Sequence, residues 1–211
     1  MDLPAATCFT ARIIIRLREI QGIAWNRIRF RRPKVFSVGE LVVYPAQGVG
    51  RVEKIEEQDL GGAKAVLYIV RILSNNVTLM VPVNNADNVG LRPVSGKGQG
   101  QEILSFLEDR SDFTGYSGQN WNRRYREYSD KLKSKDLQDV AYVLKELFLI
   151  SRDKELSFGE RRLMEQAMGL ISMELSYALS IDQEEAKSRV EALFADILSP
   201  EVQEHDDQED I

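Results

Sequence analysis

The sequence is poor in side chains that many enzymes and metal sites use. Among its 211 residues are one cysteine, Cys8, and one histidine, His205. A lone cysteine excludes an intrachain disulfide. A Cys/His zinc site needs about four ligands of that kind, and a Ser-His-Asp or Cys-His nucleophile needs a histidine that the fold holds in place. The sequence also has no P-loop. We therefore predict a non-enzymatic protein without a cofactor or metal. A carboxylate-type enzyme, with several Asp or Glu side chains converging in one pocket, is kept as an alternative.

Long hydrophobic runs are also missing. No apolar stretch approaches the roughly 20 residues that cross a bilayer, and the run Ile13-Ile14-Ile15 is interrupted by Arg12 and Arg16. The same run is too short for a signal peptide. Together with the single cysteine, these absences predict a cytoplasmic protein with no membrane partner.

Composition divides the chain into segments. Residues 1–35 are basic, residues 36–94 have the pattern of short strands, residues 101–198 have helical periodicity, and residues 199–211 are acidic. Residues 95–100, "SGKGQG", are expected to form a flexible linker. We predict an α+β protein of two domains, in which a small SH3-like β-barrel is followed by a compact domain of about five α-helices.

Turn residues divide the β-rich segment. Gly61-Gly62 and Asn75-Asn76 suit tight turns between strands, because Gly and Asn tolerate positive φ. Pro82 is expected to close its strand, since proline cannot donate to the ladder. The residues between these turns are mainly Val, Ile, Leu and Tyr, which β-structure prefers.

Caps and apolar stripes define the helical segment. Ser157 with Glu160, and Asp182 with Glu185, have the spacing of a capping box. A weaker pattern indicates a helix over residues 102–108. Three apolar stripes at helical spacing are expected to form the core of this domain. They comprise Leu137, Val140, Ala141, Leu144, Leu147 and Phe148; Leu163, Ala167, Leu170, Ile171, Leu175 and Ala178; and Ala186, Val190, Leu193, Phe194 and Ile197.

The two ends differ in charge. The basic segment 1–35 is interpreted as a disordered extension or as the product of a start site placed too far upstream, and the natural chain is expected to begin near Val35. The acidic segment 199–211 is expected to be disordered. It is interpreted as a solubilising tail, with mimicry of nucleic acid as the alternative.

Cations gather around one tryptophan in "NWNRRYREY", although the formal net charge of the chain is -5. Asn120 is a good N-cap, so Trp121 falls in the first turn of a helix. Arg123, Arg124 and Arg126 would attract DNA phosphates, and an exposed tryptophan beside them could act as a wedge in the minor groove. In the alternative interpretation, Trp121 is buried and the arginines are a solvated helix face.

Several stretches resemble the bacterial CarD/CdnL family of transcription regulators. They are "FSVGELVVYPAQGVGRVEKIEE" and "VPVNNADNVGLRPV" in the β-rich part, and "NWNRRYREYSDKLKSKDLQDVAYVLKELF" and "LSFGERRLMEQAMGLISMELSYAL" in the helical part. The resemblance covers about residues 36 to 198 in one order. No single motif is decisive, but the combination is specific.

The resemblance implies a function. It implies a Tudor-like first domain that binds the RNA polymerase β subunit by β-augmentation, and a second domain that binds promoter DNA at the upstream edge of the melted region and stabilises the open complex. Trp121 matches the family's wedge tryptophan. Arg123, Arg124 and Arg126 match its basic neighbours at the phosphate backbone. The expected protein is a monomer, associated with the nucleoid through the polymerase.

The polymerase-binding edge implied by the resemblance includes the strand around Val77, Thr78, Leu79 and Met80, facing the strand that ends near Gln58. Some family members have arginine at the positions of Gln58 and Met80, so contacts through these two side chains are in doubt. Residues 77–80 could equally be an ordinary strand. The alternative function is a protein-interaction adaptor that never touches DNA and buries Trp121.

Overall fold

The computed structural model describes residues 35–60, 63–111 and 121–198, and these lie in one compact unit of the chain. Four expectations therefore lie outside the described residues: the nature of the basic segment 1–34, the turn at Gly61-Gly62, the N-cap at Asn120 and the disorder of segment 199–211.

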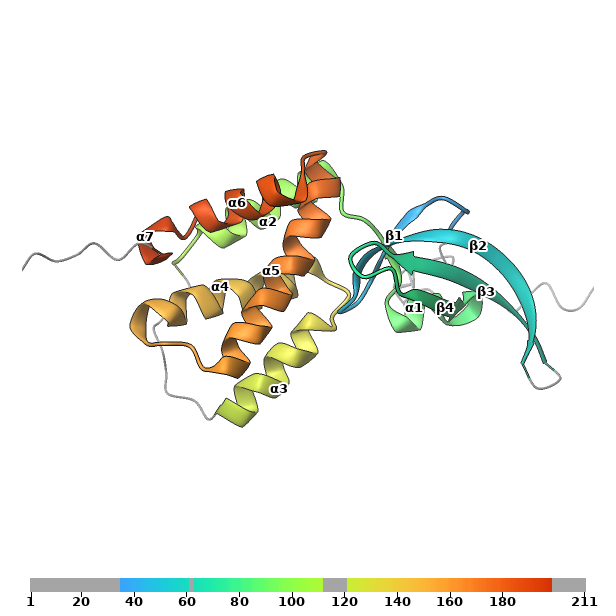
Figure 1. Cartoon of the computed structure of the whole chain (residues 1–211), viewed down its shortest axis with the longest axis horizontal. Coiled ribbons are helices and arrows are strands. Elements are labelled where there is room, and N and C mark those ends of the chain that lie inside the picture. Colours follow the sequence, from blue (N-terminus) through green and yellow to red (C-terminus); the bar gives the residue numbers. More distant parts are fainter. Residues whose placement is uncertain (1–34, 61–62, 112–120, 199–211) are drawn as a thin grey trace, which may run out of the picture. The chain divides into compact units, whose positions relative to one another are not determined.

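The first part of the described chain is a five-stranded antiparallel sheet (Figure 1). Its strands have the spatial order β4-β3-β2-β1-β5, so β4 and β5 are the two edges among the described residues. A 3₁₀ turn and the short helix α1 separate β4 from β5. The strands are β1 (Leu41–Tyr44), β2 (Gly48–Leu60), β3 (Ala63–Ile72), β4 (Thr78–Pro82) and β5 (Arg92–Pro93), and α1 spans Ala86–Val89.

Alternating apolar residues build the core of the sheet. Val52 on β2 and Tyr68 and Val70 on β3 are buried together. The hydroxyl of Tyr68 accepts a hydrogen bond from the backbone N–H of Phe36 at 3.1 Å, which fixes the start of the described chain against the sheet. The predicted Asn75-Asn76 turn is confirmed, because Asn76 has φ 57° two residues before β4 begins.

The second part is helical, and the α+β prediction is confirmed. Helices α4 and α5 supply most of its core, and the rings of Phe148 and Phe194 stack at 4.2 Å between α4 and the segment after α6. No helix in the described ranges is both long and apolar enough to cross a membrane. The helices are α2 (Lys97–Glu108), α3 (Trp121–Leu132), α4 (Leu137–Asp153), α5 (Phe158–Leu179), α6 (Gln183–Ala192) and α7 (Ala195–Leu198).

The join at residues 95–100 differs from the expected flexible linker. The backbone N–H and the hydroxyl of Ser95 both donate to Glu174 on α5, at 3.1 and 2.6 Å, and Arg92 pairs with the same carboxylate. Residues from Lys97 onward already belong to α2. Gly100 is buried, and a Cβ there would lie 3.2 Å from that of Ala178. This glycine therefore permits close packing of α2 on α5 instead of providing flexibility.

We expect Gly50→Ala to destabilise the protein by about 1–3 kcal/mol, as overpacking usually does. A Cβ at Gly50 would lie 2.8 Å from Val70 Cγ1 and 2.9 Å from the Arg71 carbonyl oxygen, so β2 and β3 would have to shift. Urea unfolding followed by circular dichroism measures the change. The control is Gly98→Ala on α2, where a Cβ meets nothing within 4 Å and stability should rise by up to about 1 kcal/mol. Equal effects of the two substitutions would contradict this explanation.

Candidate nucleic-acid interface

Helix α3 has a buried face and an exposed face. Arg124, Tyr128 and Leu132 are buried and follow one another at four-residue spacing, which places them on one side of a helix. The hydroxyl of Tyr128 donates to Glu146 on α4 at 2.6 Å, and Tyr142 donates to the other oxygen of that carboxylate at 2.7 Å. Burial, and secondarily the bond to Glu146, raise the pKa of Tyr128, so this hydroxyl keeps its proton and stays a donor. These contacts fix α3 on α4.

The placement of Arg124 corrects the interpretation that it lies at the phosphate backbone. Arg124 is only 6 % exposed, and its guanidinium pairs with Glu160 on α5 at 2.8 Å. A phosphate could not reach it without breaking this packing. Arg124 is buried because it lies on the face of α3 that packs against the other helices.

The start of α3 carries accessible aromatic and basic residues, namely Trp121, Arg123, Tyr125 and Arg126. Arg123, Tyr125 and Arg126 are exposed, and Trp121 is partly exposed while it also packs against the helical core. The rings of Trp121 and Tyr125 lie 5.4 Å apart between centroids. The predicted neighbours Arg123 and Arg126 are therefore accessible to solvent on the helix that Trp121 begins, whereas Arg124 is buried.

Helix α5 adds residues to this surface that the sequence analysis did not identify. Phe158 begins α5 and is 81 % exposed, unusually high for a phenylalanine. Arg161 and Arg162 follow at three and four positions, the spacing at which helical side chains are neighbours, and both are exposed. The apolar stripe of α5 could have revealed Phe158, because that residue lies on the opposite side of the helix from Ala167.

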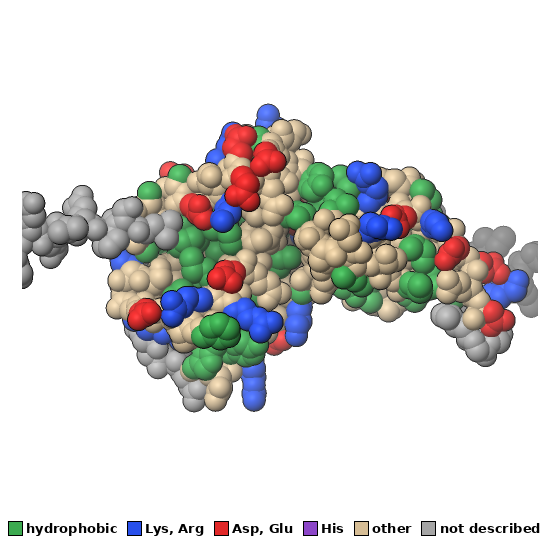
Figure 2. Space-filling view, viewed as in Figure 1, with side chains coloured by type: hydrophobic (Ala, Val, Ile, Leu, Met, Phe, Trp, Pro, Cys, Tyr) green, Lys and Arg blue, Asp and Glu red, His purple; other side chains and the backbone are tan. Residues whose placement is uncertain are grey.

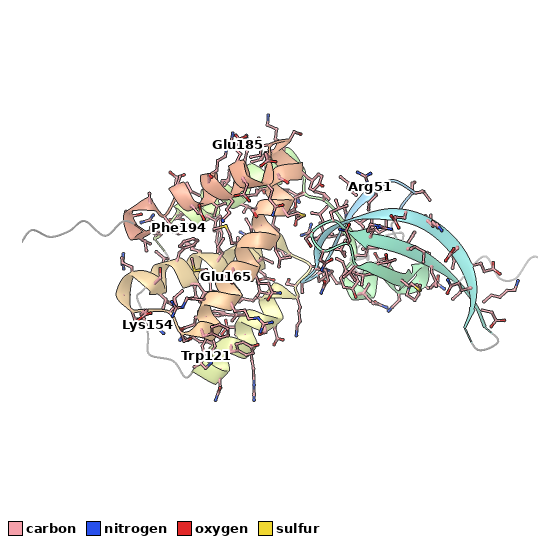
Figure 3. The ribbon with its side chains drawn as sticks, in the orientation of Figure 1. Arg51, Trp121, Lys154, Glu165, Glu185 and Phe194 are labelled. Atoms are coloured by element: carbon pink, nitrogen blue, oxygen red, sulfur yellow. The ribbon has the colours of Figure 1, made fainter. Side chains whose placement is uncertain are left out.

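We call this region the aromatic–basic surface (Figures 2 and 3). Trp121 lies where α3 begins, and Figure 2 shows an apolar patch there with Lys and Arg side chains beside it. The aromatic–basic surface consists of Trp121, Arg123, Tyr125, Arg126, Phe158, Arg161 and Arg162.

Glu160 connects the elements under this surface. Its carboxylate is 1 % exposed and accepts hydrogen bonds from Arg124 at 2.8 Å and from Lys154 at 2.9 and 3.0 Å. The backbone N–H and the hydroxyl of Ser157 also donate to it, each at 2.8 Å. The predicted Ser157–Glu160 capping box is confirmed. One carboxylate thus holds α3, the loop after α4 and the first turn of α5 together.

The pKa of Glu160 lies below its ordinary value. Burial alone would raise it, but the hydrogen bonds from Ser157 and Lys154 outweigh that effect. A carboxylate with a lowered pKa stabilises the fold above the pKa of the unfolded chain, and this stabilisation is lost as pH falls through the folded value. Glu160 is therefore charged in the folded protein at neutral pH.

The residues expected to bind polymerase are only partly brought together. Thr78, Leu79 and Met80 lie on the edge strand β4, and Val77 directly precedes it. Met80 is 61 % exposed. The expectation that this strand faces the strand ending near Gln58 is wrong: β4 pairs with Leu67–Arg71 of β3, whereas Gln58 on β2 pairs with Ala65 of β3. The strand β3 lies between β2 and β4, so Gln58 is not a neighbour of Met80.

A cavity of about 490 Å³ beside α5 and α6 is relevant to the carboxylate-enzyme alternative. Glu165, Glu184 and Glu191 line it, but so do Arg161 and Lys187, and Lys187 pairs with Glu191 at 3.8 Å. No group of three or more His, Cys, Asp or Glu in the described part of the chain is placed to hold a metal ion. The carboxylates here are mixed with cations and do not converge on a common point.

Comparisons with known proteins find matches in both parts of the chain. The family model "CarD-like/TRCF RID domain" matches residues 36–95, and the model "CarD, C-terminal domain" matches residues 102–191. A Bacillus subtilis (strain 168) protein named "Putative transcription factor YdeB" is 28% identical over 157 residues, which make up 73% of this chain and 99% of that protein. A solved structure, "CdnLNt from Myxoccoccus xanthus", shares 40% sequence identity, covers 30% of this chain and 89% of its own, and has a TM-score of 0.26.

The chain belongs to the CarD/CdnL family. The two family models follow one another along the chain, the first over the sheet and the second over most of the helical part. This membership gives the protein a role in transcription, and the resemblance in the sequence is confirmed.

We expect Glu160→Gln to lower the free energy of unfolding at pH 7 by about 3 kcal/mol, because it removes the buried negative charge that pairs with Arg124 and Lys154. The difference from wild type should shrink as pH falls below 4.5, the ordinary pKa of the group, since wild-type Glu160 is then progressively protonated. Urea unfolding between pH 7 and pH 3 tests this. Glu165→Gln, at an exposed position on the same helix, is the control. A constant difference from wild type over this range would contradict the assigned role of the Glu160 charge.

Proposed function

We propose that the protein bridges RNA polymerase and promoter DNA and stabilises the open promoter complex. The edge strand β4 binds the β subunit of the polymerase, and the aromatic–basic surface binds DNA at the upstream edge of the melted region. The observation that carries the proposal is a partly exposed tryptophan and an exposed phenylalanine at the starts of two helices that also carry exposed arginines, on a chain whose net charge is -5.

The charges of the surface favour a polyanion. Arg123 and Arg126 on α3 and Arg162 on α5 are exposed, and Glu127 is an exposed opposing charge on α3. Arg161 pairs with Glu155 at 3.3 Å, but both side chains are largely exposed, and such a surface pair is weak enough to exchange for a phosphate. Binding through these arginines should fall steeply with added salt, because each phosphate contact releases condensed counterions.

The aromatic rings favour a distorted groove over regular duplex. Apolar side chains that enter the minor groove unstack a base step, and this is easiest where the duplex is already opening. Trp121 and Phe158 offer such side chains beside the arginines. Contacts of this kind carry little base information, so the protein is expected to bind without strong sequence specificity.

Open-complex stabilisation follows from a difference in affinity. A protein that binds the melted promoter more tightly than the closed promoter shifts the equilibrium by that difference. About 1.4 kcal/mol corresponds to a tenfold shift. The DNA contact itself can be weak, because the contact with polymerase raises the effective concentration of the aromatic–basic surface at the promoter.

The edge strand β4 supports the polymerase contact. An exposed sheet edge can pair with a strand of a partner through main-chain hydrogen bonds. Val77 and Met80 add apolar side chains that are 44 % and 61 % exposed. Because Gln58 lies two strands away, the proposed contact is confined to Val77, Thr78, Leu79 and Met80. The match of residues 36–95 to a model shared with the transcription-repair coupling factor supports a polymerase-binding role for this sheet.

We expect wild-type protein to lengthen the lifetime of an open complex on an unstable promoter, and Trp121→Ala to lose most of that effect, about tenfold if the contact is worth about 1.4 kcal/mol. The lifetime is measured by competitor challenge with purified polymerase. Tyr177→Ala is the matched control, because Tyr177 is an exposed aromatic residue near the other end of α5. Equal lifetimes with wild type, Trp121→Ala and no added protein would favour the adaptor alternative.

A separate variant tests the polymerase contact. We expect Met80→Asp to weaken binding to the polymerase β subunit by about tenfold, because a charge would be desolvated in an apolar contact. Binding of the protein to promoter DNA alone should not change. Val38→Asp is the control, since Val38 is also 61 % exposed but lies outside the strands. Equal loss of polymerase binding in the two variants, or in neither, would refute the assignment of β4 as the binding edge.

A further inference from the structure

We infer that Gly159 and the Arg124–Glu160 ion pair position Trp121, so that the indole is held in one orientation before DNA arrives. This inference rests on the proposed DNA contact of Trp121. It assigns a role to a glycine and to a buried arginine that do not themselves touch DNA.

Gly159 provides the space in which the indole lies. A Cβ at Gly159 would be 2.7 Å from Cζ2 of Trp121, 3.4 Å from Cη2 and 3.7 Å from Cε2. The six-membered ring of the indole therefore lies directly against the backbone of the first turn of α5. A separation of 2.7 Å is too short for two carbon atoms, so any side chain larger than hydrogen would displace the indole or the helix.

Backbone conformation does not explain this glycine. Gly159 lies inside α5, between Phe158 and Glu160, and it is not among the residues with positive φ. Glycine is unfavourable in a helix relative to alanine, so Gly159 lowers the stability of α5. The close approach of Trp121 is the feature of the structure that requires a residue without a side chain.

Arg124 constrains the indole from the same helix. Its guanidinium carbon lies 5.9 Å from the centroid of the Trp121 ring, within the range of a cation–π contact. Glu160 holds this guanidinium at 2.8 Å. Trp121 is thus in contact with Gly159 and Arg124, and Arg124 is bound to Glu160. Phe158 directly precedes Gly159 and Glu160 in the first turn of α5. This turn therefore also sets the orientation of Trp121 relative to Phe158.

Preorganisation of this kind should be visible in function. Fixing a side chain before binding removes the entropic cost of ordering it in the complex, which corresponds to roughly a two- to tenfold change in affinity. Loss of the position of Trp121 should therefore weaken open-complex stabilisation by about that factor, even though every residue of the aromatic–basic surface is still present.

The experiment uses the full chain with Trp25→Phe, which leaves Trp121 as its single tryptophan. Into this background go Gly159→Ala and, as the control, Gly169→Ala on the same helix, where a Cβ meets nothing within 4 Å. We expect Gly159→Ala to change the emission maximum and acrylamide quenching of Trp121 and to shorten the open-complex lifetime by roughly two- to tenfold. Gly169→Ala should change neither.

A double-mutant cycle distinguishes a specific clash with Trp121 from a general loss of stability in Gly159→Ala. In the variant Trp121→Phe the smaller ring leaves room for a Cβ at Gly159, so adding Gly159→Ala should no longer lower the free energy of unfolding. The inference is overturned if Gly159→Ala leaves the fluorescence of Trp121 unchanged, or if its effect on stability is the same with Trp and with Phe at position 121. If Trp121→Ala itself leaves the open-complex lifetime unchanged, the proposed function is wrong. The fluorescence of Trp121 and the double-mutant cycle still test separately whether Gly159 positions the indole.

Discussion

The candidate interface depends on the hydrogen bonds and ion pairs made by the buried carboxylate of Glu160. A charge this deeply buried is tolerated only when it is paired and hydrogen-bonded, and Arg124, Lys154 and Ser157 together satisfy it. Because these partners come from α3, from the loop after α4 and from the cap of α5, the same requirement fixes where α3 begins relative to α5. The placement of Trp121 against Gly159 at the start of α5 is a consequence of that constraint.

The arginines of α3 divide into two roles for the same reason. Arg124 points inward and neutralises a carboxylate, whereas Arg123 and Arg126 point outward and keep their charge available. A chain with net charge -5 can therefore offer a local cationic surface. In the proposed mechanism the polymerase contact through β4 brings this surface to the promoter, so a weak and sequence-independent DNA contact is sufficient.

Much of this arrangement follows from local signals in the sequence. The Asn75-Asn76 turn, the strand end at Pro82 and the Ser157–Glu160 capping box were predicted and are observed, since each depends on a few neighbouring residues. The errors concern tertiary packing. The inward direction of Arg124 and the separation of Gln58 from β4 depend on which elements pack together, and the pattern of one segment does not contain that information. The contact between Trp121 and Gly159 likewise joins positions that are 38 residues apart in the sequence.

The most direct test of a DNA-binding role for the aromatic–basic surface is site-specific photo-cross-linking in the assembled polymerase–promoter complex. The photoreactive residue p-benzoylphenylalanine is introduced at Phe158, which is 81 % exposed, and in a separate protein at Tyr177, which is 39 % exposed on the same helix. We expect a cross-link from position 158 to promoter DNA at the upstream edge of the melted region and none from position 177. Cross-links from position 177 alone, or from position 158 to polymerase without DNA, would contradict this expectation.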